Sequence, residues 1–98
     1  MRDDYDWQGV RKALSSGSLA RSPAEDQYIE LRRILARGVM FRRLDKNVTQ
    51  VRLAKLMGSS QSRVAKMEAA DPSVSLDLLI RALFVLGASR RDLMKMLW

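Results

Sequence analysis

The sequence contains no cysteine and no histidine among its 98 residues. The lack of cysteine excludes disulfides and thiolate metal sites, and the lack of histidine excludes imidazole bases and His-type zinc sites. No apolar run reaches 18 residues, and the acidic start at residues 1–6 has no hydrophobic segment of the kind found in secretory signals. Glycine-rich loops beside paired carboxylates are also missing. These absences predict a cytoplasmic protein that is not an enzyme, does not enter a membrane, and needs no metal or cofactor.

The charge of the chain is large and unevenly distributed. The formal net charge is +7, yet residues 1–30 carry four basic and six acidic groups, which gives −2. Residues 31–98 carry the other 14 basic and 5 acidic groups, which gives +9. A basic body of this kind favours a polyanionic partner, usually nucleic acid. The alternative is a well-solvated surface with an incidental excess of cations.

The chain lacks β-branched runs with period-two alternation, and helix-favouring residues dominate it, which predicts an all-α fold. Serine and threonine caps mark the start of each predicted helix, and left-handed or helix-stopping residues mark most ends. We predict an acidic N-terminal arm over 1–21, with a short amphipathic helix over 6–14 or no fixed structure, followed by one domain over 22–98. Five helices are predicted in that domain, over 22–45, 49–58, 60–69, 75–87 and 89–98, with Ser59 as an alternative cap for the third.

An apolar stripe in each segment indicates which residues form the core. The first predicted helix offers Tyr28, Leu31, Leu35 and Val39. The next three offer Val51, Leu53, Ala54, Leu56, Met57, Val64, Met67, Leu76, Leu79, Ile80, Leu83 and Leu86.

The segment from Thr49 to Glu68 has the form of a helix-turn-helix, because two short helices meet at a turn that contains Gly58. Ala54 is small where the helices would cross, and Val64 would fill the space between them. The second helix leaves polar side chains on the face near its start. Arginine can bond bidentately to guanine, glutamine to adenine, and lysine to guanine or phosphate. The residues predicted to contact bases are Gln61, Ser62, Arg63 and Lys66.

Residues 35–89 resemble the Cro/cI-like (XRE) family of repressors, through the Thr49-Gln50 pair, Leu53-Ala54, Gly58, Ser60-Gln61-Ser62, Val64 and Glu68. The resemblance implies a five-helix, lambda-repressor-like helix-turn-helix domain that binds double-stranded DNA. It places Gln50 at a phosphate, and it pairs Arg43 with Glu68, although two unrelated surface charges are the alternative. The phosphate-contacting residues expected here are Gln50, Ser60, Arg42, Arg52 and Lys55.

Two positions depart from the family pattern. The loop after the second motif helix often carries basic residues in the family, whereas this chain has Asp71-Pro72-Ser73-Val74-Ser75. Any phosphate contact from this loop is therefore expected from backbone amides and hydroxyls. Asn47 also replaces the usual glycine at the end of the first helix, where asparagine can adopt the left-handed conformation. The first predicted helix, over 22–45, is rich in arginine. Of its arginines, Arg42 is expected near DNA, and Arg32 and Arg33 are not.

Recognition by one helix covers about half an operator, so a homodimer on a pseudo-palindrome is expected. The predicted interface is the last helix, at Leu93, Met94, Leu97 and Trp98. The acidic arm resembles that of HigA-type antitoxins, which implies a basic RelE-like toxin held by Tyr5, Trp7, Val10 and Leu14. The alternatives are a stand-alone phage-type or controller repressor, and a helix-turn-helix coactivator that lacks specific DNA readout.

Overall fold

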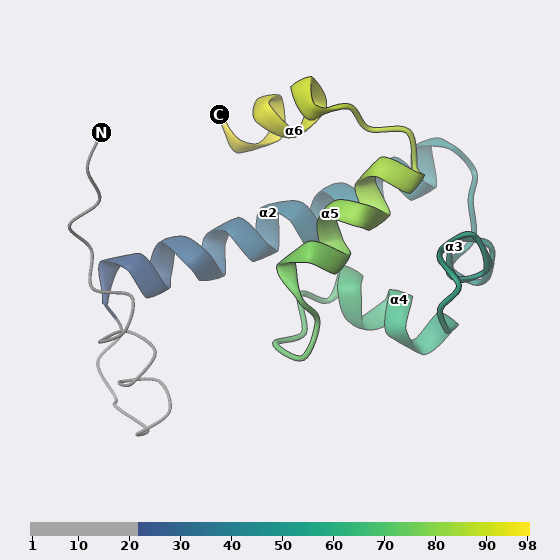
Figure 1. The fold of residues 1–98 in the computed structure, drawn as a ribbon, viewed down its shortest axis with the longest axis horizontal. Helices are drawn as coiled ribbons and strands as arrows, with labels where there is room; N and C mark the ends of the chain where they lie inside the picture. Colours follow the sequence, from purple (N-terminus) through teal and green to yellow (C-terminus); the bar gives the residue numbers. More distant parts are fainter. Residues whose placement is uncertain (1–21) are drawn as a thin grey trace. The chain divides into compact units, whose positions relative to one another are not determined.

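The computed structural model describes residues 22–98, and in that part of the chain it contains five α-helices and no strand. The helices are α2 (Pro23–Asp45), α3 (Gln50–Met57), α4 (Gln61–Glu68), α5 (Leu76–Val85) and α6 (Arg90–Leu97), as drawn in Figure 1. The all-α, five-helix prediction is confirmed for these residues. The predicted short helix over 6–14 and the toxin-binding residues Tyr5, Trp7, Val10 and Leu14 lie outside the described residues.

The chain divides into two compact units, Met1–Glu30 and Leu31–Trp98. In the described part of the first unit, the Ser22 hydroxyl accepts a hydrogen bond from the Glu25 backbone N–H at 3.1 Å, as predicted for the start of α2. Glu25 and Asp26 occupy the first turn, where negative charge is favourable to the helix dipole. Tyr28 is exposed, so the prediction that it joins the buried stripe is wrong. The division of the chain at residue 21 stays a prediction.

The four helices of the second unit that begin within it use the same N-terminal device. In each case the hydroxyl of the capping residue accepts a hydrogen bond from the backbone N–H three residues later, at 3.0–3.2 Å. The capping residues are Thr49, Ser60, Ser75 and Ser89. These caps were predicted, and the choice between Ser59 and Ser60 resolves to Ser60. Such a cap contributes about 1 kcal/mol to helix stability. The caps fix where α4 begins, and therefore which of its side chains face outward.

Four helices also end alike, in a left-handed residue whose successor donates its N–H to a carbonyl five residues earlier. The left-handed residues are Asn47, Gly58, Ala70 and Gly87, with φ of 58°, 64°, 55° and 88°. The closing N–H···O distances are 2.8–3.0 Å. Asn47 behaves as the sequence predicts, whereas Ala70 was not expected, because alanine in this conformation costs roughly 1–2 kcal/mol.

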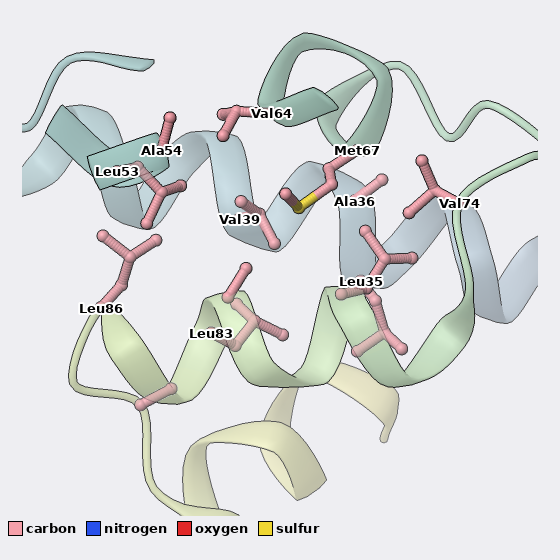
Figure 2. Close-up of a cluster of buried hydrophobic side chains, with 13 residues drawn as sticks. Leu35, Ala36, Val39, Leu53, Ala54, Val64, Met67, Val74, Leu83 and Leu86 are labelled. Atoms are coloured by element: carbon pink, nitrogen blue, oxygen red, sulfur yellow. The ribbon is translucent and has the colours of Figure 1, made fainter. Parts of the chain in front are cut away.

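The core of the second unit gathers side chains from α2 to α5, together with Val74 and Leu86 from the segments beside α5, as Figure 2 shows. Most of the predicted core residues are buried: Leu35, Val39, Leu53, Ala54, Val64, Met67, Leu79, Leu83 and Leu86. Leu31, Met57, Leu76 and Ile80 are half-buried against them. Val51 and Leu56, however, are 51% and 49% exposed, so that part of the prediction is wrong. Since α3 has only two turns, its buried face is centred on Leu53 and Ala54 and leaves its flanks in solvent.

The last helix, α6, packs against the core of the second unit through half-buried side chains alone. None of its residues is fully buried. A Cβ atom at Gly38 would lie 2.9 Å from the Met96 sulfur, so glycine lets α6 approach α2 closely. In both figures α6 lies on the opposite side of α5 from α4. Among residues 22–98, none packs against the outer face of α6, where Met94 and Trp98 are exposed.

Candidate DNA interface

The centre of the candidate site is the pair α3 and α4, joined by the turn at residues 58–60. Gly58 allows the turn because its φ of 64° is left-handed. Leu53 and Ala54 of α3 and Val64 of α4 are buried together in the core. This packing fixes the angle between the helices, and it directs the remaining face of α4 toward solvent.

The exposed face of α4 carries the residues predicted to contact bases. Val64 and Met67 point into the core, Ala65 and Glu68 are half-buried, and the polar side chains nearer the start of the helix are exposed. The exposed polar residues are Gln61, Ser62, Arg63 and Lys66. No large apolar side chain obstructs this face, so a polyanionic groove could receive it.

A chain of hydrogen bonds joins this face to the interior. The Gln61 side-chain amide donates to the Gln50 Oε1 at 3.1 Å, and the Gln50 amide donates to the Glu68 Oε1 at 3.1 Å. Arg43 completes the chain by donating from Nη2 to the same Glu68 oxygen at 2.9 Å. The arrangement of Gln61 is therefore set by contacts that reach back to α2.

Arg43 and Glu68 form an ion pair that is largely removed from solvent, since their side chains are only 11% and 6% exposed. Arg43 also donates to Glu68 Oε2 at 2.5 Å and to the Val48 carbonyl at 2.9 Å. The hydrogen bond to Glu68 raises the pKa of Arg43 above its usual value, so the guanidinium stays charged. A buried pair of this kind fixes geometry more than it adds stability. Here it ties α2 to α4 at the start of the polar chain.

The predicted phosphate-contacting residues are separated by the structure into two places. Gln50, Arg52 and Lys55 lie on α3 and Ser60 caps α4, and Gln50 is bonded to Gln61 of the exposed face of α4. Arg42 does not join them. Its guanidinium donates to the Leu86 and Gly87 carbonyls at 3.3 Å and pairs with Asp92 at 3.4 Å. These contacts hold the α5–α6 turn against α2, and the expected contact of Arg42 with DNA stays a prediction.

Sequence reasoning missed a second structural arginine. Arg32 is 8% exposed and donates from Nη2 to the Asp71 carbonyl at 2.6 Å. Its only sequence signal was its position one helical turn before Leu35 and Ala36, on the buried side of α2. Arg32 thus supports the loop between α4 and α5.

That loop uses its own donors internally. The Asp71 carboxylate accepts the backbone N–H of Ser73 at 2.8 Å and its hydroxyl at 2.7 Å. These two bonds hold the pKa of Asp71 below its usual value. The Ser73 groups that were expected to contact phosphate are consequently engaged by a carboxylate of the same loop.

Within residues 22–98, no group of three or more acidic side chains is placed to bind a metal ion. Over the same residues, no helix combines the length and hydropathy that a membrane crossing requires.

Residues 39–93, more than half of the chain, match the helix-turn-helix family HTH_3. The match spans the last two turns of α2, the whole α3–α4 pair, α5 and the first half of α6. No significant match occurs among curated proteins or among solved structures. The matched family is one of XRE-type, DNA-binding transcription regulators, which typically lack enzymatic activity. The matched residues include the α3–α4 pair, whose geometry is that of a helix-turn-helix. The chain belongs to the helix-turn-helix family HTH_3.

Proposed function

We propose that the protein is a sequence-specific transcriptional repressor that binds a pseudo-palindromic operator as a homodimer. The observation that carries the proposal is the exposed polar face of α4, anchored through Gln50 to the buried ion pair of Arg43 and Glu68. A side chain held in place before binding loses little conformational freedom when it meets a base. This arrangement favours recognition of sequence over simple attraction to charge.

Each residue of the face has a suitable base partner. Gln61 gives one N–H to Gln50 and keeps its carbonyl oxygen and second N–H, which match the donor and acceptor edge of adenine. Arg63 suits guanine, and Lys66 suits guanine or phosphate. Ser62 adds a hydroxyl that can serve either type of base. The phosphates flanking the site would be held by Gln50, Ser60, Arg52 and Lys55.

The proposed dimer interface is the outer face of α6. Trp98 is fully exposed, Met94 is 71% and Leu97 44% exposed, and Leu93 is half-buried beside them. Adjacent apolar side chains on one short helix favour burial against a partner. A second copy brought to this face by two-fold symmetry would present two α4 helices to one duplex.

We further propose that the repressor is the antitoxin of a type II toxin–antitoxin pair, which regulates its own operon. The support is the sequence of residues 1–14, where Asp3, Asp4 and Asp6 accompany the apolar Tyr5, Trp7, Val10 and Leu14. An acidic segment with apolar anchors is complementary to a basic protein such as a RelE-like ribonuclease. The alternatives to be tested against this proposal are a stand-alone repressor and a protein-bridging coactivator.

Paired substitutions test DNA readout. Arg63→Ala should cost about 1–3 kcal/mol on selected duplexes and relax the preference at one base pair, because a bidentate base contact is lost. Gln50→Ala should weaken binding to all sequences through loss of its proposed phosphate contact, and it should also release the side chain of Gln61. The measurement is binding of both variants to selected and random duplexes. Equal losses on both kinds of DNA for Arg63→Ala would contradict base reading, and a lack of any sequence preference in the unaltered protein would favour the coactivator.

Co-purification from the native host tests the antitoxin role. The bait is the full chain, compared with a chain lacking residues 1–20. Capture of a small basic ribonuclease by the full chain alone would support both the toxin partner and the arm. Failure of either bait to retain such a ribonuclease, with operator binding intact, would favour a stand-alone repressor.

A further inference from the structure

Asp71 is the first polar residue after α4, the proposed recognition helix. The backbone of Asp71 is fixed to the last turn of α4, because its N–H donates to the Lys66 carbonyl at 3.0 Å. Ala70, immediately before it, takes the left-handed conformation that turns the chain back at this point. Asp71 is thus held at the end of the helix that carries Arg63 and Lys66.

The carboxylate of Asp71 is held by the loop, as its backbone is. Asp71 Oδ1 accepts two hydrogen bonds from Ser73, at 2.7 and 2.8 Å. On the other side, the largely buried guanidinium of Arg32 donates to the Asp71 carbonyl at 2.6 Å. Ser73 thus orients the carboxylate of Asp71, and Arg32 holds its backbone.

The charge of this carboxylate persists at neutral pH. The Ser73 bonds lower its pKa, and the nearby charges of Lys66 and Arg32 lower it further. A negative charge is therefore built beside Lys66, a cation of the face proposed to meet DNA. It opposes the approach of phosphates, and it partly cancels the attraction of Lys66 for them.

Binding to random DNA and to an operator depend differently on that charge. Affinity for random DNA comes almost entirely from neutralising phosphates, whereas affinity for an operator includes hydrogen bonds to base edges. We propose that Asp71 is a specificity-determining residue, which weakens the binding of this protein to random DNA more than its binding to the operator. The proposal rests on the proposed function, in which α4 enters the major groove.

Asp71→Asn tests the proposal, because asparagine keeps the oxygen that accepts from Ser73 and removes only the charge. The matched control is Asp92→Asn. Asp92 is also a carboxylate that accepts a backbone N–H, from Ser89 at 2.8 Å, and it lies on α6, on the opposite side of α5 from α4. Both variants change the net charge by the same amount.

Binding of the full chain to a random duplex, and to the best duplex selected from a random pool, is measured by fluorescence anisotropy at several salt concentrations. For Asp71→Asn we expect affinity for the random duplex to rise about three- to tenfold and the salt slope to steepen by up to about 0.9. Affinity for the selected duplex should rise by less, so the ratio of the two affinities falls. Asp92→Asn should shift both duplexes equally and slightly.

The proposal is overturned if Asp71→Asn behaves like Asp92→Asn, or if its affinity falls on both duplexes, which would mean that the carboxylate supports the bound loop. Circular dichroism melting of each variant separates these results from a loss of folding. A full chain that binds neither duplex would overturn the proposed function itself, and this inference with it.

Discussion

Replacing Glu68 with alanine should destabilise the protein far more than its position at the end of a surface helix suggests. The substitution leaves the Arg43 guanidinium, whose side chain is 11% exposed, without the carboxylate that accepts two of its hydrogen bonds. Breaking a buried ion pair from one side costs about 3–5 kcal/mol. Because a small part of this pair still meets water, we expect about 3 kcal/mol, or a fall in Tm of roughly 15 °C for a domain of this size.

Urea unfolding followed by circular dichroism at pH 7 measures this loss as a change in midpoint at constant slope. The control is the double variant Arg43→Met with Glu68→Leu, which removes both charges and keeps apolar volume. It should lose less than about 1 kcal/mol, because no uncompensated charge is left behind. If Glu68→Ala costs under about 1 kcal/mol, or if the double variant is as unstable as the single one, the pair does not act as described here.

Three further predictions concern single features of the fold. Ala70→Gly should raise Tm by about 2–5 °C, because glycine tolerates a φ of 55° without strain, while the control Ala65→Gly inside α4 should lower it; a lower Tm for Ala70→Gly would refute the strain argument. The double variant Leu97→Ala with Trp98→Ala should be monomeric by light scattering at concentrations where the unaltered protein is dimeric, and a dimer that survives would place the interface elsewhere. Hydrogen bonds from Ser89 lower the pKa of Asp92 in the folded state, so the stability that this carboxylate contributes is present above its unfolded pKa and is lost as pH falls through the folded pKa. Asp92→Asn should therefore lose less stability than the unaltered protein over that pH range in an acid titration. Identical titrations would contradict this role of Asp92.

The helix boundaries could be predicted because their causes are local. A cap such as Ser60 acts on an N–H three residues away, and a left-handed Asn47 or Gly58 closes bonds within its own helix. All of these can be recognised in a short window of sequence. The α3–α4 pair followed from such signals, and so did the residues on its exposed face.

The arginines could not be assigned in the same way. The partners of Arg32 and Arg42 are 39 to 50 residues away in sequence, and only the packing of α2 against later segments brings them together. Composition therefore showed a basic helix without showing which of its cations were already engaged. The exposure of Val51 and Leu56 has a related cause, because a helix of two turns with five apolar residues fits several faces equally well by periodicity.

Arg42 and Arg43 are adjacent in sequence and face different parts of the protein. Arg42 fastens the α5–α6 turn, and Arg43 fastens α4. In the proposed dimer, α6 fixes the two-fold axis and α4 reads a half-site, so these two neighbouring arginines, together with the shared core, set the separation of the two half-sites. An inserted residue there would rotate one arginine by about 100° relative to the other. A change in the helical phase of α2 between the two arginines would then alter the operator spacing of this protein.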